Sequence, residues 1–174
     1  MSENENELGP LFDAIKQKVK DRFGSKLNAV EIYEPMRNKK IKSPAVLIEL
    51  VDMKTGGRNS GGLFALNVEF VAHCILSMQT ENVAVEVSNF AAAFVLLLDR
   101  QKWGLSNVEN PVDVSAAPGM FKPDDNGFES MAVSWVQTVH IGNEWELPDF
   151  MPTDIYLGEF PNVGADNLDS YEQA

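Results

Sequence analysis

Two stretches of the chain alternate apolar and polar residues with a period of two. The first is LFALNVEFVAHCIL (63–76), and one of its faces is apolar: Phe64, Leu66, Val68, Phe70, Ala72, Cys74 and Leu76. The second is ESMAVSWVQTVHIG (129–142), where Gln137 interrupts a face that otherwise contains Met131, Val133, Trp135, Val139 and Ile141. A period of two over fourteen residues is typical of a β-strand with one buried face. We therefore expect two long strands.

Three shorter runs predict further strands. AVLIELVDM (45–53) is rich in β-branched and apolar residues, and LNAVEIY (27–33) and VDVSAA (112–117) are shorter candidates. The runs 45–53 and 63–76 lie on either side of MKTGGRNSGG (53–62). We expect these two runs to form a long antiparallel hairpin with the glycine-rich stretch at its tip.

A helical period marks residues 10–23. Pro10 suits the first turn of a helix, and Gly24 suits the position just after its end. Between them, apolar residues recur every four positions: Leu11, Ile15, Val19 and Phe23. This spacing predicts an amphipathic helix, and its outer side is basic, with Lys16, Lys18 and Lys20.

A second helical pattern covers residues 80–102. Its apolar stripe consists of Val83, Val87, Phe90, Ala91, Phe94, Leu97 and Leu98, and Gln101 continues it. Thr80 can cap the first turn, and Glu81 favours the positive end of the helix dipole. We predict a largely buried helix that packs on the sheet and ends near Trp103 and Gly104.

The order of elements predicts an α+β fold, with an antiparallel or mixed β-sheet that contains a long hairpin and is packed by two α-helices. Residues 1–9 are polar and acidic, which predicts a disordered N-terminus. The single α+β domain is expected to cover residues 10–142. Residues 143–174 contain three prolines, eight acidic residues and no Lys or Arg, so we predict an extended acidic C-terminal arm.

The arm also contains aromatic residues that are unusual for a disordered segment: Trp145, Phe150, Tyr156 and Phe160. We expect an arm of this kind to pack on a neighbouring surface. The segment RNKKIK (37–42) is the opposite in charge, with Arg37, Lys39, Lys40 and Lys42. It is interpreted as a solvated loop or as a patch that docks on an acidic surface, such as the arm of another copy.

Composition narrows the class of protein. The chain has 174 residues, of which 44% are hydrophobic, and this is enough for one domain with a real core. The net charge of −12 argues against non-specific binding of nucleic acid. A single cysteine, Cys74, allows no disulfide within the chain and is expected in the core.

The ends and the apolar runs predict neither export nor a membrane span. The N-terminal MSENENELGP has no apolar region of the kind that signal peptides contain. The longest apolar run, Phe90–Leu98, has nine residues, which is too short to cross a bilayer.

The glycine-rich stretch 53–62 does not match a nucleotide-binding motif. A Walker loop needs Lys and Ser or Thr after its last glycine, and a dinucleotide fingerprint needs a helix after it. Both are missing. We interpret the stretch as a hairpin tip, either flexible or ordered only in an assembly. Its candidate interface residues are Lys54, Gly56, Gly57, Arg58, Gly61 and Gly62.

Catalytic and metal-binding patterns are also missing. His73 and His140 are the only histidines, and neither a nucleophile elbow nor a zinc motif accompanies them. Each is interpreted as a strand-surface histidine with a hydrogen-bond partner. Asp52, Asp124 and Asp125 lack the regular spacing of an EF-hand. No catalytic residue, cofactor or metal ligand is predicted.

Six stretches of the sequence together carry a family resemblance. They are IYEP (32–35), SPAVLIELVDM (43–53), the glycine-containing hairpin, NFAAAFVLLLDRQKWG (89–104), WVQTVHIG (135–142) and PTDIYLGEFPNVGADNLDSY (152–171). They cover most of the chain, and the P-x-x-x-x-x-G…P-x-x-G core of the arm is the most specific. The sequence resembles the small tail-terminator, or tail-completion, proteins of tailed bacteriophages, in the branch of Mu-like and related contractile-tailed phages. That family's arm carries a histidine near its end, where this chain has Ala165, Asp166 and Asn167.

The resemblance implies a structural protein of the virion with an α+β fold and no enzymatic activity. Such proteins form a ring, usually a hexamer, at the head-proximal end of the tail tube. They stop tail polymerisation and join the tail to the neck or head connector. The implied partners are other copies of the chain, the tail tube protein, the sheath protein of a contractile tail and a neck protein. Nucleic acid and membranes are not among them, and the protein would be made in the cytoplasm of the host bacterium.

Two other interpretations remain. The chain could be a tail-tube or neck (head-tail joining) subunit of the same machinery, and tube proteins differ from terminators because they stack into long polymers. It could also be a small enzyme that uses His73 or His140.

Overall fold

The structure is a computed structural model that describes residues 7–34, 41–58, 61–119 and 127–142, and in the C-terminal segment 156–157, 161, 169 and 172–173. Five strands form one sheet in the order β1-β2-β3-β5-β4. Their bounds are β1 (Ala29–Ile32), β2 (Ala45–Arg58), β3 (Phe64–Ser77), β4 (Val112–Pro118) and β5 (Phe128–Ile141). The helices are α1 (Gly9–Phe23), the short 3-10 helix η2 (Gly24–Lys26) and α2 (Val83–Leu98). This is the α+β fold that the sequence predicts.

The sheet is mixed. β1 runs parallel to β2, and the pairs β2–β3, β3–β5 and β4–β5 are antiparallel. β3 lies in the centre and pairs with β5 along its whole length, from Phe64 opposite Ile141 to Ser77 opposite Phe128. The two strands with the clearest alternation in the sequence therefore lie side by side.

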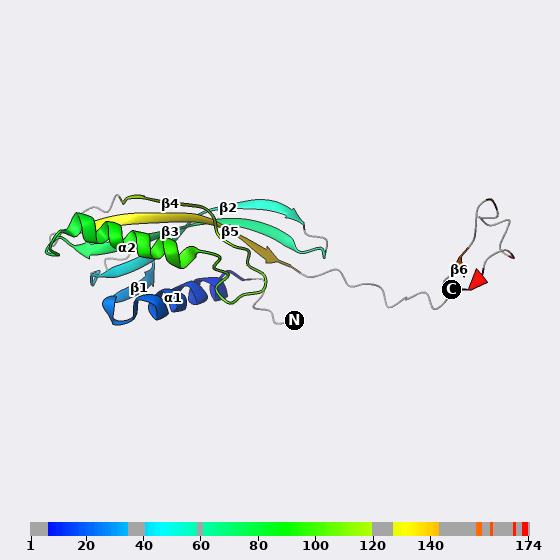
Figure 1. Ribbon diagram of the computed structural model, residues 1–174, viewed down its shortest axis with the longest axis horizontal. Helices are drawn as coiled ribbons and strands as arrows, with labels where there is room; N and C mark the ends of the chain where they lie inside the picture. Colours follow the sequence, from blue (N-terminus) through cyan, green and yellow to red (C-terminus); the bar gives the residue numbers. More distant parts are fainter. Residues whose placement is uncertain are drawn as a thin grey trace. The chain divides into compact units, whose positions relative to one another are not determined.

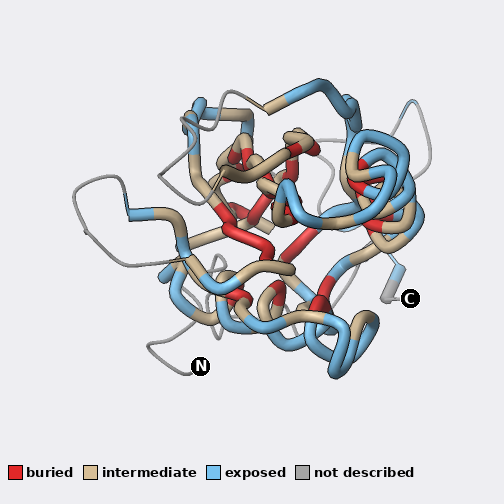
Figure 2. Tube along the Cα trace, turned by 90° about the vertical axis from the view of Figure 1, so that its left-hand side faces the viewer, coloured by how far each residue is buried: buried red, intermediate tan, exposed pale blue. Residues whose placement is uncertain are grey.

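Both helices pack on the same face of the sheet (Figure 1), and the core lies between them and the strands. Buried residues lie at the centre of this unit, and exposed residues lie on its outer surface (Figure 2). An aromatic cluster fills the middle: Phe70 stacks on Trp135 with ring centroids 5.4 Å apart, and Phe94 lies 5.9 Å from Trp135. The predicted apolar faces of β3 and β5 are confirmed at their centres, because Val68, Phe70, Ala72, Cys74, Val133, Trp135 and Val139 are buried.

Gln137, the exception on the apolar face of β5, is fully buried and acts as a hydrogen-bond hub. Its Oε1 accepts hydrogen bonds from the indole Nε1 of Trp103 at 2.7 Å and of Trp135 at 3.1 Å. Its Nε2 donates to the backbone carbonyls of Gln101 at 2.9 Å and Glu109 at 2.7 Å. The hub thus ties the segment after α2 to the sheet and satisfies polar groups that the core would otherwise bury without partners.

The strand β2 is longer than predicted, and the prediction that residues 53–62 form the hairpin tip is wrong for 53–58. Lys54 and Thr55 pair with Asn67 and Leu66 of β3, and the pairing resumes at Arg58. A shift in register between Thr55 and Arg58 accommodates the glycines as a bulge. Gly56 also has a packing reason, because a Cβ there would lie 3.0 Å from the Cβ of Ala65. From the sequence these glycines were predicted to form a turn, but in the structure they form a bulge within strand β2.

Helix α2 departs from the prediction in three ways. It begins at Val83, after Asn82 in the left-handed conformation, so Thr80 is not its cap and lies in the preceding turn. It ends at Leu98, before the predicted stop. The prediction of a largely buried helix is wrong, because one stripe is buried (Val87, Ala91, Phe94 and Leu98) while Val85 and Leu96 are 59% and 71% exposed.

Helix α1 agrees with the prediction at its C-terminal end, where Gly24 has φ +55°. Its start is earlier than expected. Gly9 is its first residue, and Leu8 packs partly on the core, so disorder through residue 9 is wrong for these two positions. The apolar side chain of Leu8 extends the helix's buried stripe by one turn, which explains the order there.

The C-terminal residues Trp145–Ala174 form a compact unit separate from Met1–Glu144. Within it, β6 (Tyr156–Leu157) pairs antiparallel with β7 (Glu172–Gln173). This pairing lies within the predicted C-terminal arm, and the extended course of the rest of the arm stays a prediction. None of the helices in the described part of the chain is long and apolar enough to cross a membrane.

Candidate interaction surface

The distal part of the β2–β3 hairpin carries one of the three groups of predicted interface residues, from Lys54 to Gly62. The helices cover the other end of the sheet, and the hairpin extends beyond them (Figure 1). Val51 and Met53 are each 51% exposed there, and Lys54 and Gly57 are also exposed. Gly61 lies in the turn, and Gly62 is buried with φ +89°. Exposed apolar side chains on a part of the sheet that the helices do not cover are unusual for a surface that faces only water.

The end of β5 lies at this same end of the sheet. Ile141, near the end of β5, pairs with Phe64, the first residue of β3 after the turn. Three strands therefore reach the distal part of the hairpin: β2, β3 and β5.

Lys42, the basic residue of the predicted patch that the structure describes, is not part of this surface. Lys42 is exposed and precedes the first residue of β2, whereas Lys54 is the tenth residue of that strand. At ~3.3 Å per strand residue, the two lysines are separated by roughly 30 Å or more. Of Arg58 and Tyr156, only the backbone is described. The remaining predicted interface residues lie outside the described residues: Arg37, Lys39, Lys40, Trp145, Phe150 and Phe160.

An ion pair between Asp52 and Lys54 lies on the distal hairpin. The Nζ of Lys54 lies 2.9 Å from Oδ2 of Asp52. The hydrogen bond and charge of Lys54 lower the pKa of Asp52 below its ordinary 3.8, and Asp52 in turn raises the pKa of Lys54. Because the pKa of Asp52 is lower in the folded protein than in the unfolded chain, the ionised carboxylate contributes stability at pH values above its unfolded pKa. This contribution is lost as the pH falls through the pKa of Asp52 in the folded protein.

We therefore expect Lys54→Ala to raise the pKa of Asp52 towards 3.8 while leaving the melting temperature at neutral pH nearly unchanged, because the pair is exposed to solvent. Titration of the Asp52 carboxyl by NMR in both proteins measures the shift. An unchanged pKa in the variant would contradict the ion pair, and Lys42→Ala serves as the control.

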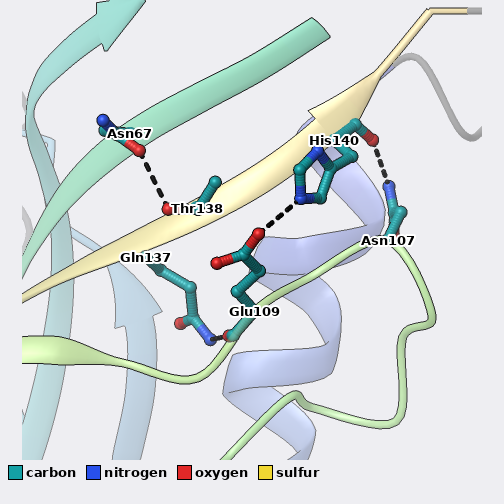
Figure 3. Close-up of polar contacts among 6 residues, drawn as sticks. All are labelled: Asn67, Asn107, Glu109, Gln137, Thr138 and His140. Atoms are coloured by element: carbon teal, nitrogen blue, oxygen red, sulfur yellow. Dashed lines mark hydrogen bonds and ion pairs between the residues drawn. The ribbon is translucent and has the colours of Figure 1, made fainter. Parts of the chain in front are cut away.

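The two histidines each have the hydrogen-bond partner that the sequence analysis predicted. His73 Nε2 lies 2.8 Å from Glu49 Oε2, across β2 and β3. His140 Nε2 lies 2.6 Å from Glu109 Oε1, and its backbone carbonyl accepts a hydrogen bond of 3.1 Å from Asn107 (Figure 3). These contacts, with the Thr138–Asn67 hydrogen bond of 2.8 Å, fasten the segment before β4 and the strand β3 to the end of β5.

The histidines cannot share one site. His140 pairs with Ala65 on β3, eight residues from His73 on the same strand, which corresponds to roughly 26 Å. Groups of three or more metal-ligating side chains do not occur among the described residues. The arrangement is that of two isolated glutamate–histidine pairs on a strand surface.

Cys74 lies in the core, as predicted. Burial raises the pKa of its thiol to about 12, so almost no thiolate exists at pH 8. We expect a thiol reagent such as DTNB to label the folded protein at least 100-fold more slowly than the unfolded protein. Equal labelling rates in the presence and absence of denaturant would contradict this burial.

The sequence analysis missed two surfaces. The first is the sheet face opposite the helices, called here the open face, whose centre consists of Val71, Ala132, Ser134 and Val136 with Val112, Ser115 and Ala117 of β4. The second is the outer stripe of α2, which consists of Val85, Asn89, Ala92 and Leu96. The sequence contained one signal for the outer stripe. Glu86 is the only charged residue in α2, so the exposed side of the helix has few charged side chains.

Comparison with known proteins leaves the family open. Neither the protein-family models nor the curated proteins contain a match to this chain. A solved structure whose name describes no function is 16% identical, over 76% of this chain and 97% of that chain, with a TM-score of 0.44. A likeness at this level carries no argument about function.

Proposed function

We propose that this protein is a structural subunit of a phage tail, a tail terminator that forms a ring at the head-proximal end of the tail tube. The resemblance of its sequence to tail-terminator proteins suggests this role. The single structural observation that supports it is the distal β2–β3 hairpin, which extends beyond the helices and exposes Val51 and Met53. A surface of this kind is suited to contact with another protein.

In this role the protein is a structural component and catalyses no reaction. Each subunit meets the next through a head-to-tail contact, which closes into a ring, here of about six subunits, when the rotation between neighbours permits. The hairpin, with Lys54 and its glycine bulge, contacts the tube or the sheath. Residues 143–174 reach a neighbouring subunit or the neck. Further polymerisation stops because the exposed side of the ring differs from the growing end of the tube and does not bind another tube subunit.

The experiment that tests this function is a capping assay with the tail tube protein of the same phage. Tube polymerisation is followed by electron microscopy with and without the protein. We expect shorter tubes that carry a ring at one end. Unchanged tube lengths and bare ends would reject the terminator function, and incorporation along the tube would favour a tube subunit.

Two deletions in the same assay separate the roles of the two regions. Removal of residues 143–174 is expected to leave unit Met1–Glu144 folded and to abolish ring formation or joining to the neck. Replacement of residues 54–63 by a two-residue turn is expected to leave the ring intact and to abolish capping. Normal rings and normal joining after the first deletion would contradict the role of the arm.

The alternative of a small enzyme rests on His73 and His140. Their separation and their hydrogen bonds to Glu49 and Glu109 favour a structural role. His73→Ala and His140→Ala are both expected to leave capping unchanged. Loss of biological function in a variant that still folds and still caps tubes would reopen the enzyme interpretation.

A further inference from the structure

Helix α2 presents apolar residues on two opposite sides. Its inner stripe is buried against β3 and β5, and its outer stripe exposes Val85 and Leu96 at 59% and 71%. Outer-stripe positions recur at intervals of four, three and four residues, which is the spacing of a helix face that packs on another surface. A helix that is apolar on both sides is normally buried on both sides. Within the described chain, α2 is covered on one side only.

Among the described residues, the open face of the sheet is the second surface that no helix covers, since both α1 and α2 lie on the other face. At one end, a small cluster around Leu47 and Ile75 closes it. The centre consists of small and β-branched residues such as Ala132, Ser134 and Val136, and β4 beside them is exposed along its whole length. This is the kind of flat surface on which a helix packs in an α+β protein.

The charged groups of the open face are largely paired within the chain. Glu49 is held by His73, Asp52 by Lys54 and Glu109 by His140. Glu69 lies opposite Val136 and places an acidic side chain beside the centre of the face. The outer stripe of α2 is uncharged, and the exposed Arg100 and Lys102 follow its C-terminal end. These two cations complement the acidic Glu69 of the open face.

We propose that the outer stripe of α2 in one copy of this chain packs on the open face of the next copy. This proposal rests on the ring of the proposed function and names its interface. The occupant of the open face is a second copy because both halves of the contact, an uncovered helix and an uncovered sheet, occur on this chain on opposite sides of one two-layer unit. Such a contact joins two different patches, so it is heterologous and repeats from copy to copy until the ring closes.

Pairing through the edge strand β4 is a weaker route to the same assembly. Pro111 precedes the strand, Pro118 is its last residue, and a register shift between Val112 and Ser115 interrupts its pairing with β5. Prolines and bulges are the devices by which natural sheets prevent edge-to-edge pairing. Electrostatics also favour the α2 contact, because each copy has a net charge of −12 and this contact brings the cations Arg100 and Lys102 towards the acidic Glu69.

Two variants test the proposal, and each of them blocks a different half of the contact. Leu96→Glu places a charge on the outer stripe, and Ser134→Glu places one on the open face. Ser25→Glu, at an exposed position of η2, adds the same charge elsewhere and is the matched control. Masses are measured by sedimentation and light scattering over a concentration series at ~0.15 M salt, where long-range repulsion is screened. Circular dichroism melting verifies that each variant folds, and Ala92→Glu is a second outer-stripe variant.

The wild type and Ser25→Glu are expected to associate equally. Leu96→Glu alone and Ser134→Glu alone are expected to be monomers, with self-association at least tenfold weaker. An equal mixture of the two is expected to give dimers and nothing larger, because each pair joins one intact helix stripe to one intact open face and then has no further match.

Other outcomes overturn the proposal in distinguishable ways. Self-association of Ser134→Glu alone would show a helix-to-helix contact, and self-association of Leu96→Glu alone would show a face-to-face contact. Unimpaired association of both variants would place the ring contact elsewhere and leave the terminator function standing. A wild type that stays monomeric over the whole series would also overturn this contact, while the capping assay would still judge the function independently.

Discussion

Gln137→Leu is expected to lower the free energy of unfolding by about 3–5 kcal/mol. The substitution leaves the indole N–H groups of Trp103 and Trp135 buried without an acceptor, and the carbonyls of Gln101 and Glu109 lose a donor. Each buried polar group without a partner costs about 1–3 kcal/mol, and the added apolar burial of leucine offsets part of the total. Chemical denaturation measures the loss.

The position next to Gln137 supplies the control. Thr138 points to the other side of β5 and makes one part-buried hydrogen bond, to Asn67. Thr138→Val is therefore expected to cost only about 1 kcal/mol. A change of less than 1.5 kcal/mol for Gln137→Leu would show that the hub contributes no more than an ordinary hydrogen bond.

Phe94→Ala is expected to destabilise the fold by about 3–5 kcal/mol, the range for removing a buried aromatic ring. Phe94 is fully buried, stacks on Phe23 with centroids 6.4 Å apart and contacts Trp135, so it joins both helices to the sheet. These two rings belong to α1 and β5 and cannot close the cavity without moving those elements. The measurement is denaturant unfolding of dilute protein.

Leu96→Ala on the same helix is the matched control, because Leu96 is 71% exposed. It truncates an exposed side chain to the same Cβ and is expected to change stability by less than about 0.5 kcal/mol. Equal destabilisation by the two substitutions would mean that the assignment of the inner and outer stripes of α2 is wrong.

Residues with a regular period could be predicted from sequence, because one buried face imposes the period directly. The alternation in 63–76 and 129–142 located β3 and β5, and the four-residue spacing from Leu11 to Phe23 located α1. Gln137 stood out as a break in its pattern, but only the structure shows why it is tolerated. Its four partners come from the segment after α2 and from β5 itself.

Features that depend on pairing between distant residues could not be predicted. Lys54, Gly56 and Gly57 resemble a turn by composition, yet the register with Asn67, Leu66 and Phe64 keeps them in a strand. The start of α2 at Asn82 was missed because Thr80 is the better cap by residue type. Which side of α2 remains exposed is decided by where the sheet lies, and no local pattern contains that information.

The candidate interface was predicted in part. The hairpin was correctly located as a surface element, but Lys42 lies at the other end of β2, far from Lys54. The outer stripe of α2 and the open face were missed, because a sequence shows that a residue is apolar and does not show whether its own chain covers it. Both surfaces become visible only when the sheet has two helices on one face and none on the other.

The mass of the purified protein in solution, measured by light scattering over a concentration series and joined to negative-stain microscopy, tests the central claim most directly. The account predicts closed rings, roughly 116 kDa for six copies of the 19.3 kDa chain. Long tubes would contradict it and assign the protein to the tail tube. A monomer at every concentration that also leaves isolated tail tubes uncapped would contradict the assembly function altogether.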